Sequence, residues 1–345
     1  MKASYKKYIL NFKRPSGTSR GVLTEKETWF IILEENDKQG IGECGILRGL
    51  SIDDRPDYEE KLKWVCNNIH LGEEVLWNEL TEFPSIQFGL EVAFRSLKSK
   101  SSYLLFPSAF TEGQESITIN GLVWMGEKEF MKKQIEQKLQ QGFNCIKLKI
   151  GAIDFDKELD LLAYIRSNFD AETIEIRVDA NGAFSVDEAL NKLQQISKYQ
   201  IHSIEQPIKQ GQVSEMAQLC ITSPIPIALD EELIGIFGYK NKQALLEKIQ
   251  PQYIILKPSL VGGYKGSDEW ILLAEQNNIG WWATSALESN IGLNAIAQWT
   301  FTKNSTMPQG LGTGALYTNN FTAPLEVNKG KLHYSAGIEW VVDFN

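Results

Sequence analysis

The 345-residue sequence predicts an α/β protein, a TIM-like (β/α)7–8 barrel that follows an N-terminal α+β capping domain. Two observations carry this prediction. From residue 117 onward, short β-branched and apolar runs alternate with amphipathic segments, and one run follows another about every 25–30 residues, as βα units do. Before residue 115, strand-like segments come first and helix-like segments follow, an order typical of a separate α+β unit.

The capping domain is expected to span residues 1–115, completed by the C-terminal segment 320–345. Its first strand-like segment is rich in β-forming residues and is joined to the second by a turn-like stretch, and its helix-like segments repeat apolar residues at helical spacing. These segments are residues 28–33, 40–45, 57–70 and 86–99. Residues 15–21 (PSGTSRG) are expected to form a flap, and residues 49–51 a second loop that reaches the barrel mouth.

The barrel domain is expected to span residues 116–319. Its eight strand-like runs are residues 117–123, 145–150, 174–178, 202–205, 225–229, 253–257, 280–284 and 309–312. No run is followed by GxGxxG or GxxxxGK[ST], so an open sheet that binds phosphate loses support. Because parallel crossovers are right-handed, all the strand carboxyl ends meet on one face, which carries the active site in such barrels.

Composition restricts the partners. The chain has 35 Lys and Arg against 44 Asp and Glu, a formal net charge of −9, which disfavours nucleic acid and anionic membranes as partners. No apolar run approaches the ~20 residues of a membrane span, and the N-terminus lacks the apolar core of a signal peptide. The four cysteines and three histidines are scattered, without a zinc or disulfide pattern. We therefore expect a cytoplasmic enzyme with a small-molecule substrate; oligomeric state is not indicated.

Acidic residues end three consecutive strand-like runs: Asp179, Glu205 and Asp230, spaced 26 and 25 residues apart. Each interval matches one βα unit, so the carboxylates are expected side by side. Neighbouring carboxylates raise each other's pKa because their negative charges repel, and a bound cation removes that repulsion. An all-oxygen ligand set suits Mg²⁺, with Mn²⁺ as a substitute. A single strand-end acid is more often a helix N-cap, but three in register make that alternative weaker.

Lysines flank these acids. A period of two places Lys147 and Lys149 on one face of their strand, toward the barrel interior, while the apolar residues between and beside them face the helices. Lys257 ends the sixth run, on the opposite side of the ring. Two neighbouring ammonium groups lower each other's pKa, which favours a neutral amine able to act as a base. A metal flanked by lysines suits removal of a proton next to a carboxylate, because the metal stabilises the enediolate that results.

This combination of motifs resembles the muconate-lactonizing-enzyme branch of the enolase superfamily, which uses Lys or His bases with Mg²⁺. The motifs are Lys147-x-Lys149, Asp179-Ala-Asn181, Glu205-Gln-Pro207, Asp230-Glu231 and Lys257-Pro258. Within the branch, softer motifs at residues 42–47, 119–123 and 284–289 are similar to the o-succinylbenzoate synthase family of menaquinone biosynthesis.

The resemblance implies a carbon–oxygen lyase that dehydrates 2-succinyl-6-hydroxy-2,4-cyclohexadiene-1-carboxylate (SHCHC) to o-succinylbenzoate through an enediolate. Lys149 would be the general base and then the acid, and Lys257 would stabilise the enediolate. Lys147 would contact the carboxylate and lower the pKa of Lys149. The metal ligands implied are Asp179, Glu205 and Asp230.

Further substrate contacts are expected from Asn181 and from Arg20 in the flap, although a lone loop arginine is more often solvent-exposed. The second carboxylate of the substrate needs its own site. Ser285 opens the seventh helical segment and Gly312 lies in a glycine-rich loop, and both features can offer backbone N–H groups to an anion. Glycines that serve tight turns alone are an equally weighted alternative.

Other reactions of the branch stay open. N-succinylamino acid racemisation needs a lysine on each face of the α-carbon, which Lys149 and Lys257 also satisfy. Dipeptide epimerisation is disfavoured, because residues 311–317 (LGTGALY) lack the Asp-x-Asp that such enzymes carry there. A non-catalytic anion-binding barrel is the remote alternative, since it would leave inward-facing acids and lysines without a role.

Overall fold

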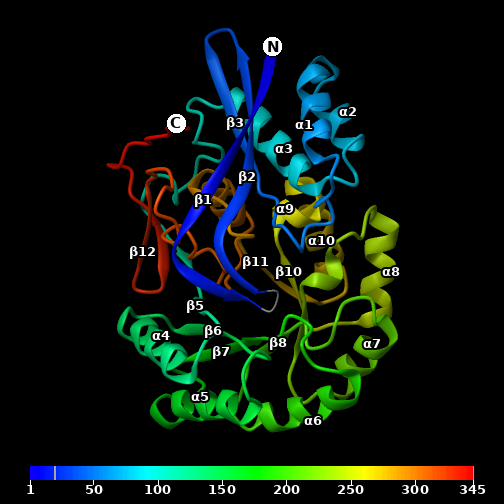
Figure 1. Ribbon diagram of the computed structural model, residues 1–345, viewed down its shortest axis with the longest axis vertical. Coiled ribbons are helices and arrows are strands. Elements are labelled where there is room, and N and C mark those ends of the chain that lie inside the picture. Colours follow the sequence, from blue (N-terminus) through cyan, green and yellow to red (C-terminus); the bar gives the residue numbers. More distant parts are fainter. Residues whose placement is uncertain (19–20, 345) are drawn as a thin grey trace.

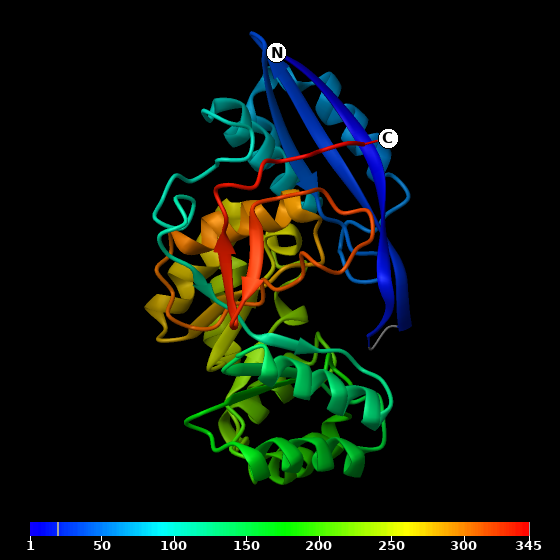
Figure 2. The ribbon, with the colours of Figure 1, turned by 90° about the vertical axis from the view of Figure 1, so that its left-hand side faces the viewer.

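The computed structural model describes residues 1–18 and 21–344. The N-terminal region and the barrel region lie one above the other (Figure 2). Arg20, the predicted flap contact, lies outside the described residues. Within the described part, no helix has the length and apolar character needed to cross a lipid bilayer.

The N-terminal region packs an antiparallel sheet, of order β1-β2-β3, against helices (Figure 1). Its elements are β1 (Lys2–Thr18), β2 (Gly21–Glu35), β3 (Lys38–Cys44), α1 (Tyr58–Asn67), the 3₁₀ helix η1 (Ile69–Leu71), α2 (Glu73–Asn78) and α3 (Pro84–Lys98). Sequence reasoning found β2, β3, α1 and α3. It missed β1, and it expected a flap where the two long strands continue to residue 18 and resume at residue 21. The hairpin of β1 and β2 extends toward the barrel (Figure 2).

Helix α3 is buried along nearly its whole length because β3 lies directly on it. Two glycines permit this approach: a methyl group on Gly42 would lie 1.9 Å from the Gly89 carbonyl oxygen. Pro84 occupies the first turn of the helix, where its fixed φ suits helix initiation. The carboxylate of Asp53 accepts hydrogen bonds from the Ser85 N–H (2.9 Å) and hydroxyl (2.5 Å), and so caps the helix.

The barrel region is a curled parallel sheet of order β11-β10-β9-β8-β7-β6-β5, with helices in the crossovers (Figure 1). The strands are β5 (Gly121–Val123), β6 (Cys145–Lys149), β7 (Glu175–Asp179), β8 (Ser203–Glu205), β9 (Ile227–Leu229), β10 (Tyr253–Leu256) and β11 (Gly280–Ala283). The helices are α4 (Lys128–Gln140), α5 (Phe155–Asn168), α6 (Val186–Ser197), α7 (Val213–Thr222), η2 (Glu231–Leu233), α8 (Tyr239–Ile249), α9 (Pro258–Val261), α10 (Gly263–Gln276) and α11 (Asn290–Phe301). The predicted βα alternation is confirmed.

The eighth predicted strand is reduced to single bridges. Gln309 pairs with Ile119 and Gly310 pairs with Thr284, both in parallel, so one short extended segment joins the two edge strands and completes the ring. Pro308 before this segment and Gly310 and Gly312 within it disfavour a regular strand.

The predicted first strand also divides. Its start is β4 (Ile117–Thr118), which pairs with β13 (Lys331–Tyr334) beside β12 (Leu325–Asn328), and its end is β5 of the barrel. Further along the C-terminal segment, Phe344 packs on Phe30 of the N-terminal sheet, with ring centroids 4.9 Å apart.

Candidate active site

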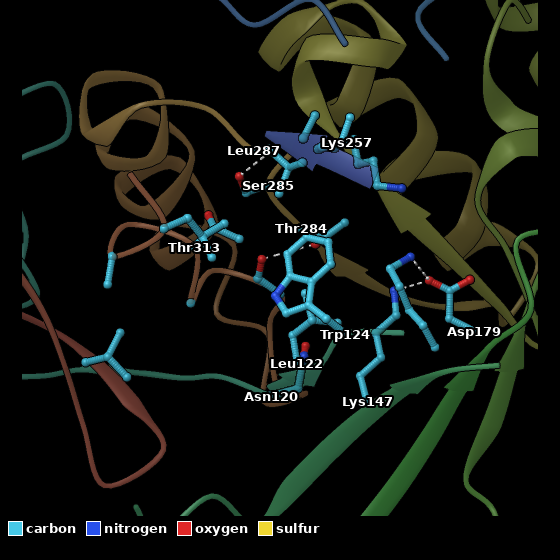
Figure 3. Close-up of a pocket in the computed structure, with 18 of the residues that line it drawn as sticks. Asn120, Leu122, Trp124, Lys147, Asp179, Lys257, Thr284, Ser285, Leu287 and Thr313 are labelled. Atoms are coloured by element: carbon cyan, nitrogen blue, oxygen red, sulfur yellow. Dashed lines mark hydrogen bonds and ion pairs between the residues drawn. The ribbon is translucent and has the colours of Figure 1, made fainter. Parts of the chain in front are cut away.

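The predicted acids and lysines meet at the carboxyl ends of β6 to β10. In the sheet register Lys149 lies beside Asp179, and Asp179 lies beside Glu205. Asp230 follows β9 directly and Lys257 follows β10. Figure 3 shows Lys147 and Lys257 reaching into a cavity from different sides, with Asp179 at the same end. The side-by-side arrangement expected from the βα spacing is therefore what the fold produces.

Each lysine is paired with a carboxylate. Lys147 Nζ lies 3.0 Å from Asp179 Oδ2 and also forms an ion pair with Glu205. Lys149 Nζ lies 2.9 Å from the same Asp179 oxygen, and Lys257 pairs with Asp230. The lysine side chains are 10–13% exposed and the carboxylates almost completely buried, so solvent screens these charges little.

Burial and neighbouring charges shift the pKa values of Asp179 and Glu205 in opposite directions. Burial alone would raise the pKa of Asp179, but the ammonium groups of Lys147, Lys149 and Lys257 outweigh it and hold that pKa well below its usual range. Burial raises the pKa of Glu205 far above its usual range, and the negative charge of Asp179 adds to this effect. The expected mutual repulsion of carboxylates thus dominates at Glu205 and is overcome at Asp179.

The expected lowering of the pKa is wrong for Lys147. Burial lowers the pKa of Lys147, but the charges of Asp179, Glu205 and Asp230 reverse the effect and raise it. The pKa of Lys257 is raised for the same reason: burial lowers it, and the acids led by Asp230 outweigh both that effect and the charge of Lys147. At Lys257, repulsion by Lys147 is a weaker effect than attraction by Asp230 and Glu205.

The donor set fits a hard divalent cation in its chemistry. Asp179, Glu205 and Asp230 supply only oxygen atoms, the ligands that Mg²⁺ prefers. Glu205 Oε1 is buried and has no hydrogen-bond partner among the described residues, an expensive state for a carboxylate oxygen. Within residues 1–18 and 21–344, no three acidic, histidine or cysteine side chains are arranged closely enough to hold a metal ion. Lys147 pairs with Glu205, and Lys257 pairs with Asp230.

A cavity of about 550 Å³ opens beside these charges, large enough for a small organic acid. Its lining includes Lys147, Lys149, Asp179, Asn181 and Lys257. Apolar side chains form the other walls. They include Leu23 of the β1–β2 hairpin, Leu50, Leu122, Trp124 and Leu287. Trp124 occupies the middle of the view in Figure 3, and sequence reasoning did not single it out.

The predicted substrate contacts differ in how many hydrogen bonds their side chains already form within the protein. Asn181 Oδ1 accepts a hydrogen bond from Lys149 (2.8 Å), and its amide nitrogen donates to Glu231 (3.0 Å). Gly312 lines the cavity. Ser285 also lines it, but its hydroxyl donates to Glu288 (2.6 Å) and accepts from the Leu287 N–H (2.9 Å). The one hydroxyl proton of Ser285 is therefore committed within its own loop.

Gln206 is a site residue whose role sequence reasoning missed. Its backbone is left-handed (φ 41°), unusual for a residue with a side chain. Its amide nitrogen donates to Glu232 (3.0 Å), and its amide oxygen accepts from the N–H groups of Asp230 and Glu232, both at 3.3 Å. Gln206 therefore joins the loop after Glu205 to the loop that starts at Asp230. The Glu-Gln-Pro motif was the available signal.

Comparisons with known proteins agree with this geometry. Residues 130–338 match the family model for the enolase C-terminal domain-like family, and residues 3–97 match the model for the MenC N-terminal domain. The chain is 48% identical to an o-succinylbenzoate synthase of Desulfotalea psychrophila, over 97% of this chain and 99% of that protein.

Solved structures give the same result. A crystal structure of MenC from Desulfotalea psychrophila matches with a TM-score of 0.86 and 45% identity, over 96% of this chain and 99% of that one. An L-Ala-D/L-Glu epimerase from Bacillus subtilis shares the fold alone, with a TM-score of 0.84 and 17% identity over 99% of this chain and 100% of that one. The chain therefore belongs to the o-succinylbenzoate synthase (MenC) family of the enolase superfamily.

Proposed function

We propose that the protein converts SHCHC to o-succinylbenzoate by dehydration, with a divalent cation, as a hydro-lyase of menaquinone biosynthesis. The observation that carries this proposal is the arrangement of Lys149, Asp179 and Glu205 in register on adjacent strands, with Lys257 on the far side of the same cavity. Family membership at 48% identity over nearly the full chain supports the same activity.

Asp179, Glu205 and Asp230 would hold the cation, with Mg²⁺ as the first candidate and Mn²⁺ as a substitute. When bound, the cation would supply positive charge that stabilises the negative charge developing on the substrate carboxylate. The unpartnered oxygen of Glu205 supports this assignment, because a buried carboxylate oxygen without a donor is otherwise a cost to the fold.

Lys149 would act first as the general base. Its neutral amine takes the proton from the carbon next to the ring carboxylate, and the C–H electron pair moves into the carboxylate. The Lys149 ammonium then returns that proton to the leaving hydroxyl as the C–O bond breaks, which releases water and leaves an aromatic ring. Asn181, whose amide oxygen accepts from Lys149 at 2.8 Å, would orient the amine.

Lys257 would face the opposite side of the substrate and stabilise the enediolate by its charge. Lys147, between Asp179 and Glu205, would contact the substrate carboxylate. For the second carboxylate we propose the backbone N–H of Gly312, with Arg20 as a further contact. The Ser285 N–H donates to the Gly310 carbonyl oxygen (3.1 Å), so Ser285 would line this subsite without donating that N–H to the anion. Residues 1–115, completed by 320–345, would cap a barrel of residues 116–319, in a cytoplasmic enzyme.

N-succinylamino acid racemisation is a candidate side activity. The observation that favours it is that two lysines from non-neighbouring strands, Lys149 at the end of β6 and Lys257 after β10, line one cavity, since proton exchange at both faces of a carbon requires two bases.

The first experiment follows SHCHC dehydration by ultraviolet absorbance. We expect activity with Mg²⁺, loss of that activity with EDTA, and recovery when Mg²⁺ is restored. Lys149→Ala should lower kcat by roughly 10³-fold or more, in the range of lost general base catalysis. Lys98→Ala, at an exposed surface ion pair, is the matched control and should keep full activity. Wild-type protein inactive on SHCHC, or active Lys149→Ala, would contradict the proposal.

A further inference from the structure

A second group of charged side chains is buried between the N-terminal region and the barrel. It consists of Lys26 on β2, Glu43 on β3 and Glu288 after β11, and we name it the interface charge cluster. Lys26 is 4% exposed and both glutamates are 0% exposed. Charges buried so deeply are costly unless other groups compensate them, and none of the three has a part in the proposed chemistry.

Glu288 ties together the ends of two barrel strands. Its Oε1 accepts a hydrogen bond from the Ser259 hydroxyl (2.5 Å), and its Oε2 accepts one from the Ser285 hydroxyl (2.6 Å). Ser259 lies two residues after the cavity-lining Lys257, and Ser285 itself lines the cavity. A single carboxylate therefore connects helix α9, which follows β10, to the loop after β11.

Glu43 holds the next part of the same loop from the other region. Its carboxylate accepts from the N–H groups of Ser289 and Gly292, both at 2.9 Å, at the start of α11. It also accepts from the Thr28 hydroxyl on β2 (2.8 Å). A carboxylate at a helix N-terminus satisfies free N–H groups and complements the helix dipole. Glu43 thus anchors the loop of residues 284–288 at its far end.

Lys26 is the basic member of the cluster and interacts electrostatically with both Glu43 and Glu288. Its Nζ is buried without a hydrogen-bond partner among the described residues. Burial lowers its pKa, and the negative charges of Glu43 and Glu288 oppose that lowering only in part. Lys26 lies three residues after Leu23, the hairpin residue that lines the cavity. The cluster therefore reaches the hairpin as well as helix α9 and the loop after β11.

Close packing leaves these segments little freedom. A methyl group on Gly45 would lie 2.8 Å from both Glu288 Cγ and Ser259 Oγ, and one on Gly292 would lie 2.7 Å from Glu288 Cβ. Gly45 leads directly into residues 47–50, another part of the cavity lining.

Leu287 lines the cavity in a left-handed conformation (φ 65°) that leucine rarely adopts (Figure 3). Its carbonyl accepts from the buried Tyr317 hydroxyl at 2.7 Å. Its N–H donates to the Ser285 hydroxyl at 2.9 Å, and Ser285 in turn donates to Glu288. Such a conformation persists only where the surroundings hold it, so the cluster contributes to the shape of the cavity wall.

We infer that the interface charge cluster is a positioning device: from outside the barrel it sets the cavity walls formed by Leu23, residues 47–50 and residues 284–287. It thereby controls substrate affinity without touching the substrate. The inference rests on the proposed function, because affinity is defined here for SHCHC.

The test compares Lys26→Met, Glu288→Gln and the double variant by steady-state kinetics with Mg²⁺. Lys26→Met should raise KM about tenfold with kcat within about threefold, the signature of lost uniform binding. Glu288→Gln should have a smaller effect, because an amide can still bond Ser259 and Ser285. Because the two residues are coupled, the double variant should raise KM by less than the product of the single effects.

Glu91→Gln is the matched control. Glu91 is also a buried carboxylate between the two regions, where it accepts from the Tyr264 N–H on α10 (2.5 Å), but neither residue lines the cavity. The Glu91→Gln variant should leave KM unchanged. An equal rise in KM for Glu91→Gln at equal loss of thermal stability, or single effects that simply multiply, would overturn the inference. If Lys26→Met fails to fold, Ser259→Ala replaces it, with an expected rise in KM of about threefold.

Hydrogen–deuterium exchange separates this inference from the proposed function. Peptides covering residues 284–289 should exchange faster in Lys26→Met than in wild type. Their exchange rate should be the same in Glu91→Gln as in wild type. If wild type is inactive on SHCHC but this difference appears, the proposed function fails and the positioning role stands. If wild type is active and these peptides exchange equally in all variants, the positioning role fails alone.

Discussion

The protein has two buried clusters in which lysine lies beside carboxylates, and they differ in what satisfies the acids. In the interface charge cluster, backbone N–H groups and hydroxyls donate to Glu43 and Glu288. At the barrel mouth, Glu205 is engaged by a lysine and keeps one oxygen without a hydrogen-bond partner among the described residues. Donors built into the fold stay in place, whereas a lysine side chain can move. The first cluster is suited to holding shape, and the second to accepting a ligand.

The largest expected effect is on activity, at the barrel mouth. Glu205→Gln removes a charge whose pKa is already raised by burial and by Asp179, so the fold should lose little. Catalysis should fall by at least about 100-fold, since even outer partners of metal ligands matter by 10–100-fold. Activity against Mg²⁺ concentration, and melting temperature with and without Mg²⁺, measure the two effects. A normal stabilisation by Mg²⁺ in the variant would argue against Glu205 as a ligand.

The reverse pattern is expected at the interface. Glu43→Ala leaves the N–H groups of Ser289 and Gly292 without their acceptor and leaves Lys26 with less compensation. Removing one partner of a buried charged group costs about 3–5 kcal/mol. Urea unfolding of wild type and variant measures this loss. A destabilisation below about 1 kcal/mol would show that Glu43 contributes less to the stability of the fold than its contacts indicate.

A smaller, pH-dependent effect is expected at Glu91. Burial raises its pKa from 4.5 to about 8, against the opposing backbone hydrogen bonds from Lys265 and Tyr264. Because the folded pKa exceeds the unfolded one, its stabilising contribution is complete below pH 4.5 and declines as pH rises toward 8. The stability advantage of wild type over Glu91→Gln should therefore shrink between pH 5 and pH 8.5 in urea unfolding. An advantage that grows with pH would mean that the ionised form is preferred.

The smallest effect is expected at the surface. Lys98 and Glu73 pair at 2.8 Å, but their side chains are 68% and 35% exposed. Exposed pairs contribute about 0–1 kcal/mol, so Lys98→Ala should shift the free energy of unfolding by less than ~0.5 kcal/mol. The same urea titration measures it. A loss comparable with that of Glu43→Ala would remove the contrast between buried and exposed charges.

Much of the site could be predicted because βα repeats carry long-range information in local spacing. Intervals of 26 and 25 residues placed Asp179, Glu205 and Asp230 at neighbouring strand ends, and the period of two turned Lys147 and Lys149 inward. The lysine pKa values could not be predicted in the same way, because they depend on distances to acids on other strands.

The sequence by itself determined the alternation of strands and helices, the strand-end acids and the inward lysines, since each follows from short-range periodicity. Only the tertiary structure decided that Lys26 is buried beside Glu43 and Glu288. Those contacts join residues up to 262 positions apart. No local pattern encodes such a meeting, because burial and charge compensation arise only when separate elements pack together.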